Sequence, residues 1–546
     1  MRRALALLTA LLGGLLVLVG TAVAVVAGPD DIAHLPTRAL PGDVGTALLP
    51  PGLLAWDGVT VAVRATGSDG GVFLGSAHPV DAESYLSGVG TFRADEITWQ
   101  GVWSGREQEG DLAAPAVAPA GATFWTDRAD GAGTRQLLLP LSGQPVAVVA
   151  VATAAEGADG GAPAPSGSLR MTMGVRVPHA FAGGVATAAL GAVLIAVAFL
   201  VGRRRPRPAD DAEPASATGP TPAADLTAVR RVVATATGAA VLTSLTGCAA
   251  VPERVELGEI RRVAIDADEV AAALASYDER NAAANALSHQ HDPSGWAAAD
   301  TGAVLAGDLY VTAWTAASGE TPTSTTSTTS AGRVYAPDFA TYPTWFLAET
   351  IWSAEGEESV PRLTVFERAT VLDPWRLSAA VDVAAEVPAP RAPGAASTAS
   401  DETRARAVET LAVVERFVES GDGTGLEPGP LAELRTAILG DDGEATSTLD
   451  VQNPVAAEDP TGPGGSVRVV AVEGGTLVTS THLMIETVQA QPDHTISFVD
   501  EVFAQVVGMT GDRETLVLPM VLSVALLLLD DGTTRVLGAD FRYRLP

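Results

Sequence analysis

The chain has 546 residues; all 34 of its basic residues are arginines, and 65 acidic residues give a net charge of −31 at neutral pH. The absence of lysine excludes a phosphate-binding loop of the GxxxxGK[ST] type, a pyridoxal Schiff base and the strand lysine of a protein kinase. The single cysteine, Cys248, can close neither an intramolecular disulfide nor a thiolate zinc site.

Most of the negative charge lies in residues 249–546, which hold 45 acids against 18 arginines. Such a region repels the phosphates of nucleic acid, so no nucleic-acid partner is expected. The acidity instead predicts a well-solvated surface. Arginine without lysine, together with abundant Ala, Gly and Val, is also typical of a GC-rich bacterial genome.

Residues 1–27 are predicted to be a signal anchor or a signal peptide. Two arginines precede the uncharged run Ala4–Ala27, which as a helix would be about 36 Å long, enough to cross a bilayer. Val25 and Ala27 also fit the −3 and −1 positions of a signal-peptidase site. Either interpretation places the following residues outside the cytoplasm.

Residues 28–178 are predicted to form an extracytoplasmic β domain, because short apolar runs alternate there with Gly, Pro and Asp at the spacing of a β-sandwich. The strand candidates are 59–64, 71–75, 98–103, 122–126, 136–140 and 146–152, with a turn at 127–133. Trp99, Trp103 and Trp125 are candidates for a ligand-binding face, although core packing or contact with lipid headgroups is favoured. Segments 72–75 and 81–89 resemble uncharacterised actinobacterial membrane proteins, which imply no catalytic residue.

A second uncharged run, residues 180–201, is predicted to be a transmembrane helix. Four arginines between positions 203 and 207 follow it, and under the positive-inside rule they return the chain to the cytoplasm. Residues 202–231, rich in Pro, Ala, Thr and Asp, are therefore expected to be a cytoplasmic linker.

Residues 232–251 are predicted to be either a third transmembrane helix or a lipoprotein signal. Two arginines precede a moderately apolar run that ends in Leu245-Thr246-Gly247-Cys248. This ending resembles the lipobox of bacterial lipoproteins, whose cysteine thiol takes a diacylglycerol group. The resemblance implies that Cys248 is a lipidation site and that membrane lipid is a partner.

A lipobox that follows two earlier spans departs from the lipoprotein pattern and leaves two explanations open. The chain could join a two-span membrane protein to a lipoprotein that begins near Val229, or the segment is a third span with a coincidental resemblance. Both explanations place residues 252–546 outside the cytoplasm. If residues 232–251 are too weakly apolar to insert, the acidic region stays inside.

The acidic region is predicted to contain two α+β units, 252–387 and 401–546, joined by a Pro- and Ala-rich hinge at 388–400. Helices are expected at 268–287, 402–420 and 430–439; the strand candidates are 304–314, 344–352, 360–366, 376–383, 466–472, 476–488, 497–507, 515–529 and 534–543. A Ser/Thr tract at 321–330 predicts a disordered or glycan-bearing loop. Asp266 and Asp268 are candidate caps of the first helix, and Asp530-Asp531-Gly532 predicts a hairpin turn.

The predicted fold class is a multi-domain membrane protein with a β-sandwich-like domain between two transmembrane helices, followed by the tandem α+β region. In each α+β unit a helix would pack on a curved antiparallel sheet. The order of elements is similar, by analogy, to the cystatin and nuclear-transport-factor-2 type of fold. The apolar run 516–529 is interrupted by Pro519 and too short to cross a membrane, so a buried strand is expected.

Two segments of the acidic region resemble a domain of unknown function found in actinobacterial lipoproteins and membrane proteins. They are Tyr277-Asp-Glu-Arg280-Asn281-Ala-Ala-Ala-Asn285 and Asp300-Thr-Gly-Ala-Val-Leu305. The resemblance could cover most of residues 255–546. It implies no mechanism, cofactor or catalytic residue.

Three groups of residues were weighed as chemical sites. His289, His291 and Asp292 could ligate zinc, but their spacing in a polar loop favours a solvated turn. Asp300-Thr301-Gly302 matches the tripeptide of aspartic proteases, but it has no second copy and is interpreted as a turn after a helix. Asp300 with Glu349 is the nearest carboxylate pair for an envelope hydrolase.

The sequence therefore supports no catalytic set, metal site or cofactor, and gives no basis for an enzyme. The leading hypothesis is a membrane-anchored binding or structural protein of the cell envelope, with an envelope protein as a possible partner. The alternatives are a lipid-anchored, ligand-binding lipoprotein that serves a transporter or the cell-wall machinery, and a carboxylate-dependent envelope hydrolase. A deep apolar pocket would distinguish the lipoprotein, and two acids converging in a pocket would distinguish the hydrolase.

Overall fold

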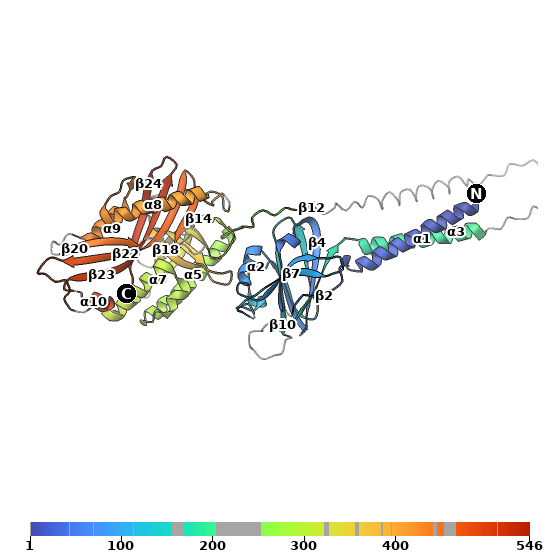
Figure 1. Cartoon of the computed structure of the whole chain (residues 1–546), viewed down its shortest axis with the longest axis horizontal. Helices are drawn as coiled ribbons and strands as arrows, with labels where there is room; N and C mark the ends of the chain where they lie inside the picture. The colour runs from blue at the N-terminus through green and yellow to red at the C-terminus, as the bar shows by residue number, and fades with distance from the viewer. Residues whose placement is uncertain are drawn as a thin grey trace, which may run out of the picture. The chain divides into compact units, whose positions relative to one another are not determined.

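The structure is a computed structural model, and the chain divides into two compact units, one made of Met1–Ala82 and Leu86–Gly258 and the other centred on Glu259–Pro546. The described residues are 2–42, 44–68, 70–112, 114–154, 167–203, 253–320, 327–354, 360–383, 386–394, 396–440, 445–452, 466–498, 500–509 and 511–545. Each unit contains several sheets and a few helices, so the chain is multi-domain and rich in β-structure (Figure 1).

The first unit consists of two long helices and two six-stranded sheets. In chain order its helices and strands are α1 (Arg2–Ala27), β1 (Ile32–His34), β2 (Arg38–Ala39), β3 (Thr46–Leu49), β4 (Trp56–Gly67), β5 (Gly70–Ala77), α2 (Pro79–Tyr85), β6 (Thr91–Ile97), β7 (Trp103–Gln108), β8 (Asp127–Ala132), β9 (Arg135–Ser142), β10 (Ala147–Ala154), β11 (Leu169–Arg176), α3 (Ala180–Arg203) and β12 (Glu253–Arg254). One sheet has the order β1-β11-β4-β12, with β2 also paired to β11 and β9 to β4; the other has the order β7-β6-β3-β10-β5-β8.

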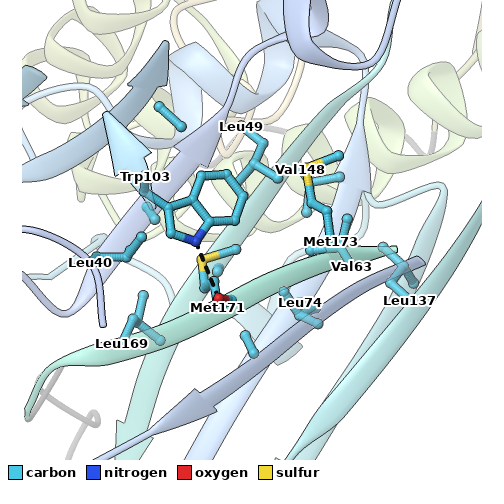
Figure 2. Packing of buried hydrophobic residues seen from close by; sticks show 14 of the residues in the cluster. Leu40, Leu49, Val63, Leu74, Trp103, Leu137, Val148, Leu169, Met171 and Met173 are labelled. Atoms are coloured by element: carbon cyan, nitrogen blue, oxygen red, sulfur yellow. Dashed lines mark hydrogen bonds between the residues drawn. The ribbon is translucent and has the colours of Figure 1, made fainter. Parts of the chain in front are cut away.

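The two sheets bury one shared apolar core, because alternate residues of each strand point to the same side of the sheet. Figure 2 shows the part of this core around Trp103 of β7, whose indole Nε1 donates a 3.1 Å hydrogen bond to the backbone oxygen of Met171. Leu49 and Leu169, one from each sheet, are fully buried beside it (Figure 2). Trp103 therefore satisfies its one polar group within the core.

Three sequence predictions in this unit are wrong. Residues 98–102 are the turn between β6 and β7, with the Thr98 amide bonded to the Val102 oxygen and Gly101 at a φ of +75°, so only the last residue of the predicted strand 98–103 lies in a strand, β7. Residues 122–126 form no strand, and the predicted turn at 127–133 is strand β8, paired along β5. The strands were predicted there because Trp99 and Trp125 have a high β-propensity. Glycine placement and cross-strand pairing instead determine where the strands begin and end.

Helices α1 and α3 lie side by side along their whole length (Figure 1). Glycines face each other across the contact: a Cβ at Gly20 would lie 2.5 Å from the Gly184 oxygen, and one at Gly13 would lie 2.7 Å from the Gly191 oxygen. On each helix the two glycines are seven residues apart, which keeps them on one face. Small residues at these positions let the two backbones approach closely.

The outer faces of this helix pair are strongly apolar. Leu18 is 72% exposed and Val25 is 75% exposed, and Ala4–Ala27 and Ala180–Val201 are each long and apolar enough to cross a membrane. A soluble surface seldom exposes so large a continuous apolar patch.

The described part of the second unit is built from helices packed on two larger sheets, which are antiparallel except for the parallel β19–β24 pair, and it also contains the small sheet β13-β15. Its helices and strands are β13 (Arg262–Val263), α5 (Ala267–Ser288), α6 (Trp296–Ala299), α7 (Gly302–Ser318), β14 (Ser327–Tyr335), β15 (Asp338–Phe339), β16 (Thr344–Ala354), β17 (Val360–Arg368), β18 (Arg376–Asp382), α8 (Asp401–Ser420), β19 (Leu426–Glu427), α9 (Pro430–Leu439), β20 (Ala445–Gln452), β21 (Val467–Val472), β22 (Gly475–Ala490), α10 (Glu501–Val506), β23 (Thr515–Leu529) and β24 (Thr534–Tyr543). The first sheet has the order β14-β16-β17-β18 and the second β19-β24-β23-β22-β20, with β21 also paired to β22.

The elements form four layers, helices, first sheet, second sheet and helices, and an apolar core lies between each two neighbouring layers. One core lies between α5, α7 and one face of the first sheet, and a second lies between α8, α9 and one face of the second sheet. A third core, which includes Leu347 and Leu477, lies between the two sheets themselves. Residue parity explains this: Phe346 and Ala348 of β16 join the helix-side core while Leu347 joins the inter-sheet core.

Most predicted elements of this unit are present, and several differ. Segment 304–314, predicted as a strand, lies in helix α7. Segment 497–507, also predicted as a strand, contains helix α10, whose N-cap Asp500 accepts bonds from two backbone amides. Residues 327–330 of the Ser/Thr tract belong to strand β14. Asp266 forms the expected capping box of α5, and β23 (Thr515–Leu529) is the expected buried strand, central in its sheet.

Candidate functional site

A buried aspartate marks the start of α7 in the second unit. Asp300 forms a parallel bridge with Leu377 of β18, and the next amide, of Thr301, donates a 2.9 Å bond to the Leu377 oxygen. Gly302 follows with a φ of +56°, a conformation that glycine adopts without strain. This turn fixes Asp300 against the sheet, where the residue is 1% exposed and neither carboxylate oxygen has a hydrogen-bond partner of normal geometry among the described residues.

A second aspartate, Asp308, lies two turns along α7. Its carboxylate is 4.0 Å from Nη1 of Arg542, which enters from strand β24. Gly307 makes room for this arginine, since a Cβ there would lie 2.6 Å from the Arg542 Cδ atom. Arg542 also donates to Asp540, 3.3 Å away. Its guanidinium therefore lies between two acids, Asp308 of α7 and Asp540 of β24.

The two carboxyl groups of α7 are coupled electrostatically. Burial, and then the neighbouring Asp308 carboxylate, raise the pKa of Asp300 to about 8. Burial raises the pKa of Asp308 to about 6, and the positive charge of Arg542 opposes this rise. Because two close carboxylates in a low-dielectric site do not both ionise readily, the pair holds a proton near neutral pH.

Helix α5 supplies the opposite side of the site. Tyr277 packs edge-on against Phe366 at 5.5 Å, and burial raises the pKa of its hydroxyl well above the ordinary value. One turn further, Arg280 donates from Nε to the Ala298 oxygen over 2.9 Å and also to the Trp375 oxygen. These bonds attach α5 to the segment that carries Asp300.

A pocket of about 210 Å³ opens between these helices and the first sheet. Its lining includes side chains from α5, α7, β16, β17 and β24: Tyr277, Asn281, Asn285, Asp308, Trp352, Arg362 and Arg542. Asp308 lies at the pocket surface, while Asp300 lies behind it. The pocket therefore combines acidic, basic, amide and aromatic groups in a small volume, as binding sites do.

The carboxylate pair expected for a hydrolase is not formed. Glu349 alternates with Ala348 and Thr350 along β16, so its side chain points to the face of the sheet opposite the α5 and α7 helices, where it lies 3.8 Å from Arg333 of β14. Asp300 lies on the helix side. The pairing of Asp300 with Glu349 was therefore wrong, and Asp308 is the acid that accompanies Asp300.

The other candidate residues lie in turns or bond to nearby backbone groups. Asp292 caps a short turn by accepting a 2.9 Å bond from the Ser294 amide, which lowers the pKa of its carboxyl. No group of three or more possible metal ligands occurs within the described ranges, His289 and His291 included. Trp125 donates to the Pro119 oxygen, whereas Trp99 is 79% exposed at its turn.

The candidate lipidation residue Cys248 and the whole segment 204–252 lie outside the described residues. The prediction for this cysteine therefore stays a prediction.

Sequence reasoning missed Asp308 and Arg542. Asp308 was placed in a strand candidate rather than in a helix that begins beside Asp300, and Arg542 is more than 200 residues away in the chain. A signal was nevertheless present. The two segments that resemble the domain of unknown function contribute Tyr277, Asn281 and Asp300, and all three converge on this pocket or directly behind it.

Comparison with known proteins gives one match. The model of a domain of unknown function, DUF8094, matches residues 262–409, which include α5, α7 and the first sheet of the second unit. No curated protein and no solved structure matches the chain. The matched domain carries no described activity, so the function of the chain is not known from similarity.

Proposed function

We propose that this chain is a membrane-anchored binding protein whose second unit takes up a small ligand in the Asp308 pocket. The observation that carries the proposal is the buried Asp300–Asp308 pair, of which Asp308 lines a polar pocket and Asp300 lies behind it. A stable fold pays for an uncompensated buried acid of this kind, and such costs are concentrated at functional sites.

The anchor in this proposal is the α1–α3 pair. Its supports are the length and apolarity of both helices and their glycine-lined contact. With the arginines after residue 202 inside, residues 28–178 would lie outside the cytoplasm, and residues 252–546 would follow them there if residues 232–251 insert or are processed. The arginine-only composition supports a bacterial, actinobacterial-type origin.

A more specific fold is proposed for each unit. The two sheets of the first unit, which share one core, support a β-sandwich. In the second unit, a helix followed by an antiparallel meander supports the analogy with cystatin and nuclear transport factor 2. The division into units 252–387 and 401–546 is proposed on the same grounds.

Membrane extraction tests the anchor. After a carbonate wash at high pH the full chain should remain in the membrane pellet, and protease added to spheroplasts should digest residues 28–178 and 252–546. Release by carbonate, or full protection from protease, would contradict the membrane and topology proposals respectively.

Mass spectrometry of the native protein tests the alternative anchor. A fragment that begins at an acylated Cys248 would show that the second unit is a lipid-anchored lipoprotein separated from α1 and α3. An intact chain of 546 residues with an unmodified cysteine would rule out this form of anchoring.

A further inference from the structure

The pocket between α5, α7 and the first sheet holds polar groups that no other part of the described chain uses. No partner of the Asn281 side-chain amide occurs among the described residues, and Asp308 lines the pocket with Asp300 behind it. Asn285 donates from Nδ2 to the Asn281 backbone oxygen, which leaves its own side-chain oxygen as an acceptor. The site thus presents both donors and acceptors.

Charges of both signs surround the pocket. Arg362 donates from Nε to Asp382 over 2.7 Å, and Arg542 is shared between Asp540 and Asp308. Burial raises the pKa of Asp300, which favours its neutral form at pH 7. A ligand with a full charge of either sign would therefore meet a like charge within the same pocket.

Hydroxyl groups fit this mixture best, because a hydroxyl can donate to a carboxylate and accept from a guanidinium or an amide. Adjacent hydroxyls on one ring can do both at once. Trp352 lines the same pocket; the Arg362 guanidinium lies over its ring, 5.4 Å from the centroid, and the C–H face of such a ligand ring can pack against the part of the indole that lines the pocket. The volume of about 210 Å³ is sufficient for a single small ring.

We propose that the pocket binds a neutral, polyhydroxylated ring of the size of one sugar unit, held by Asn281 and Asp308 and packed against Trp352. This inference rests on the proposed binding function and specifies its ligand class. Asp308 accepts from the ring hydroxyls, the Asn281 amide both donates and accepts, and the Arg542 guanidinium donates.

Ligand-observed NMR on the full chain in detergent tests the class. The neutral probes are glucose, galactose, mannose, arabinose and N-acetylglucosamine; the charged probes of the same ring size are glucosamine and glucuronic acid. At least one neutral sugar should bind, and its affinity should be at least tenfold higher than that of the charged analogues. Equal or tighter binding of a charged analogue, or binding by none of the neutral sugars, overturns the sugar-ring proposal.

Variants locate the binding. Asn281→Ala and Trp352→Ala should each lower the affinity for the bound sugar by tenfold or more. Gln290→Ala, in the exposed turn that follows α5 and outside the pocket, is the matched control and should leave it unchanged. Circular dichroism confirms that each variant is folded, and equal loss of affinity in all three folded variants would overturn the proposal, because the sugar would then not be bound in this pocket.

A second probe set separates the failure of this inference from the failure of the proposed function. It contains arginine, glutamate, glycine betaine and benzamidine. If one of these binds and Asn281→Ala weakens its binding, the pocket is a ligand site of another class, and the sugar proposal alone is wrong. If no probe of either set binds, both the sugar proposal and the proposed binding function fail.

Discussion

Asp300 shows how a single residue can cost the fold stability at neutral pH. It is 1% exposed, and its folded-state pKa of about 8 is well above the value of an aspartate in an unfolded chain. The folded protein therefore holds a proton that the unfolded chain releases, so this residue makes stability fall as the pH rises between about 4 and 8. A neutral amide of the same shape would remove this dependence.

Asp300→Asn should reduce the loss of stability between pH 5 and pH 8 by on the order of 3 kcal/mol relative to the parent chain. The reason is that the amide has no proton to release in this range. The measurement is the urea dependence of hydrogen exchange in peptides from residues 259–546 of the full chain at the two pH values.

Asp292→Asn is the control for this experiment. The pKa of Asp292 is lowered by the bonds from Ser294, so its stabilising effect is complete above its ordinary pKa and is lost only in acid. Both pH values lie above that range, and the control should keep the pH dependence of the parent. If Asp300→Asn also kept it, Asp300 would not be the buried acid that titrates.

At the scale of elements, the α1–α3 contact depends on the absence of side chains at a few positions. A Cβ at Gly20 would lie 2.5 Å from backbone atoms of α3, whereas one at Gly14 would meet nothing within 4 Å. The two glycines lie in the same helix, but only Gly20 faces α3. They form a matched pair for substitution.

Gly20→Val should separate the helices and destabilise their pairing by roughly 1–3 kcal/mol, because the backbone of α3 cannot move away cheaply. Gly14→Val should have little effect. Hydrogen exchange of α3 peptides in detergent measures the difference, and faster exchange is expected for Gly20→Val alone. The same exchange rate in both variants would show that the helices do not pack through this face.

The N-terminus of α5 positions one wall of the pocket. Asp266 accepts bonds from the Asp268 and Glu269 amides, and the Glu269 carboxylate accepts a bond from the Asp266 amide. Asp266→Ala should cost about 1 kcal/mol and speed exchange in the first turns of α5. Asp268→Ala, whose carboxylate caps no amide among the described residues, should have a smaller effect; equal effects would mean that helix charge rather than capping matters.

The sequence predicted elements well where a local signal was sufficient. Asp266 and the periodicity after it identified α5, and the length of residues 516–529 identified a strand rather than a span. Segment 304–314 was assigned to the wrong class, since a short run of apolar and β-branched residues fits a strand or a buried helix equally well. That error also hid the relation of Asp308 to Asp300, because Asp300 directly precedes the helix that carries Asp308, and it is this helix that brings the two carboxyl groups together.

The site as a whole lay beyond local reasoning. Arg542 reaches Asp308 from β24, and this approach depends on the packing of α7 over that strand and on Gly307. Neither the strand order nor the close approach leaves a periodic trace in the sequence. The glycine and the arginine could have been connected only by a signal that relates distant positions.

At the scale of the whole second unit, the two sheets share a core that joins the predicted units 252–387 and 401–546. Leu347 and Leu477 are both fully buried in this inter-sheet core. Such a core transmits destabilisation from one helix layer to the other, because one layer cannot unfold without exposing apolar surface of its neighbour. Residues 259–546 should therefore unfold as one cooperative unit.

Leu411→Ala tests this cooperativity. Leu411 of α8 is fully buried in the core between α8 and the second sheet, far in the chain from α5. Its truncation should cost about 2–5 kcal/mol, and the slowest-exchanging amides of α5, β16 and β17 should lose as much protection as those of α8, β22 and β23. Peptides from residues 46–176 of the first unit provide the internal control and should not change. Loss of protection confined to residues 401–546 would show instead that the two helix-and-sheet layers fold independently, as separate domains joined through residues 388–400.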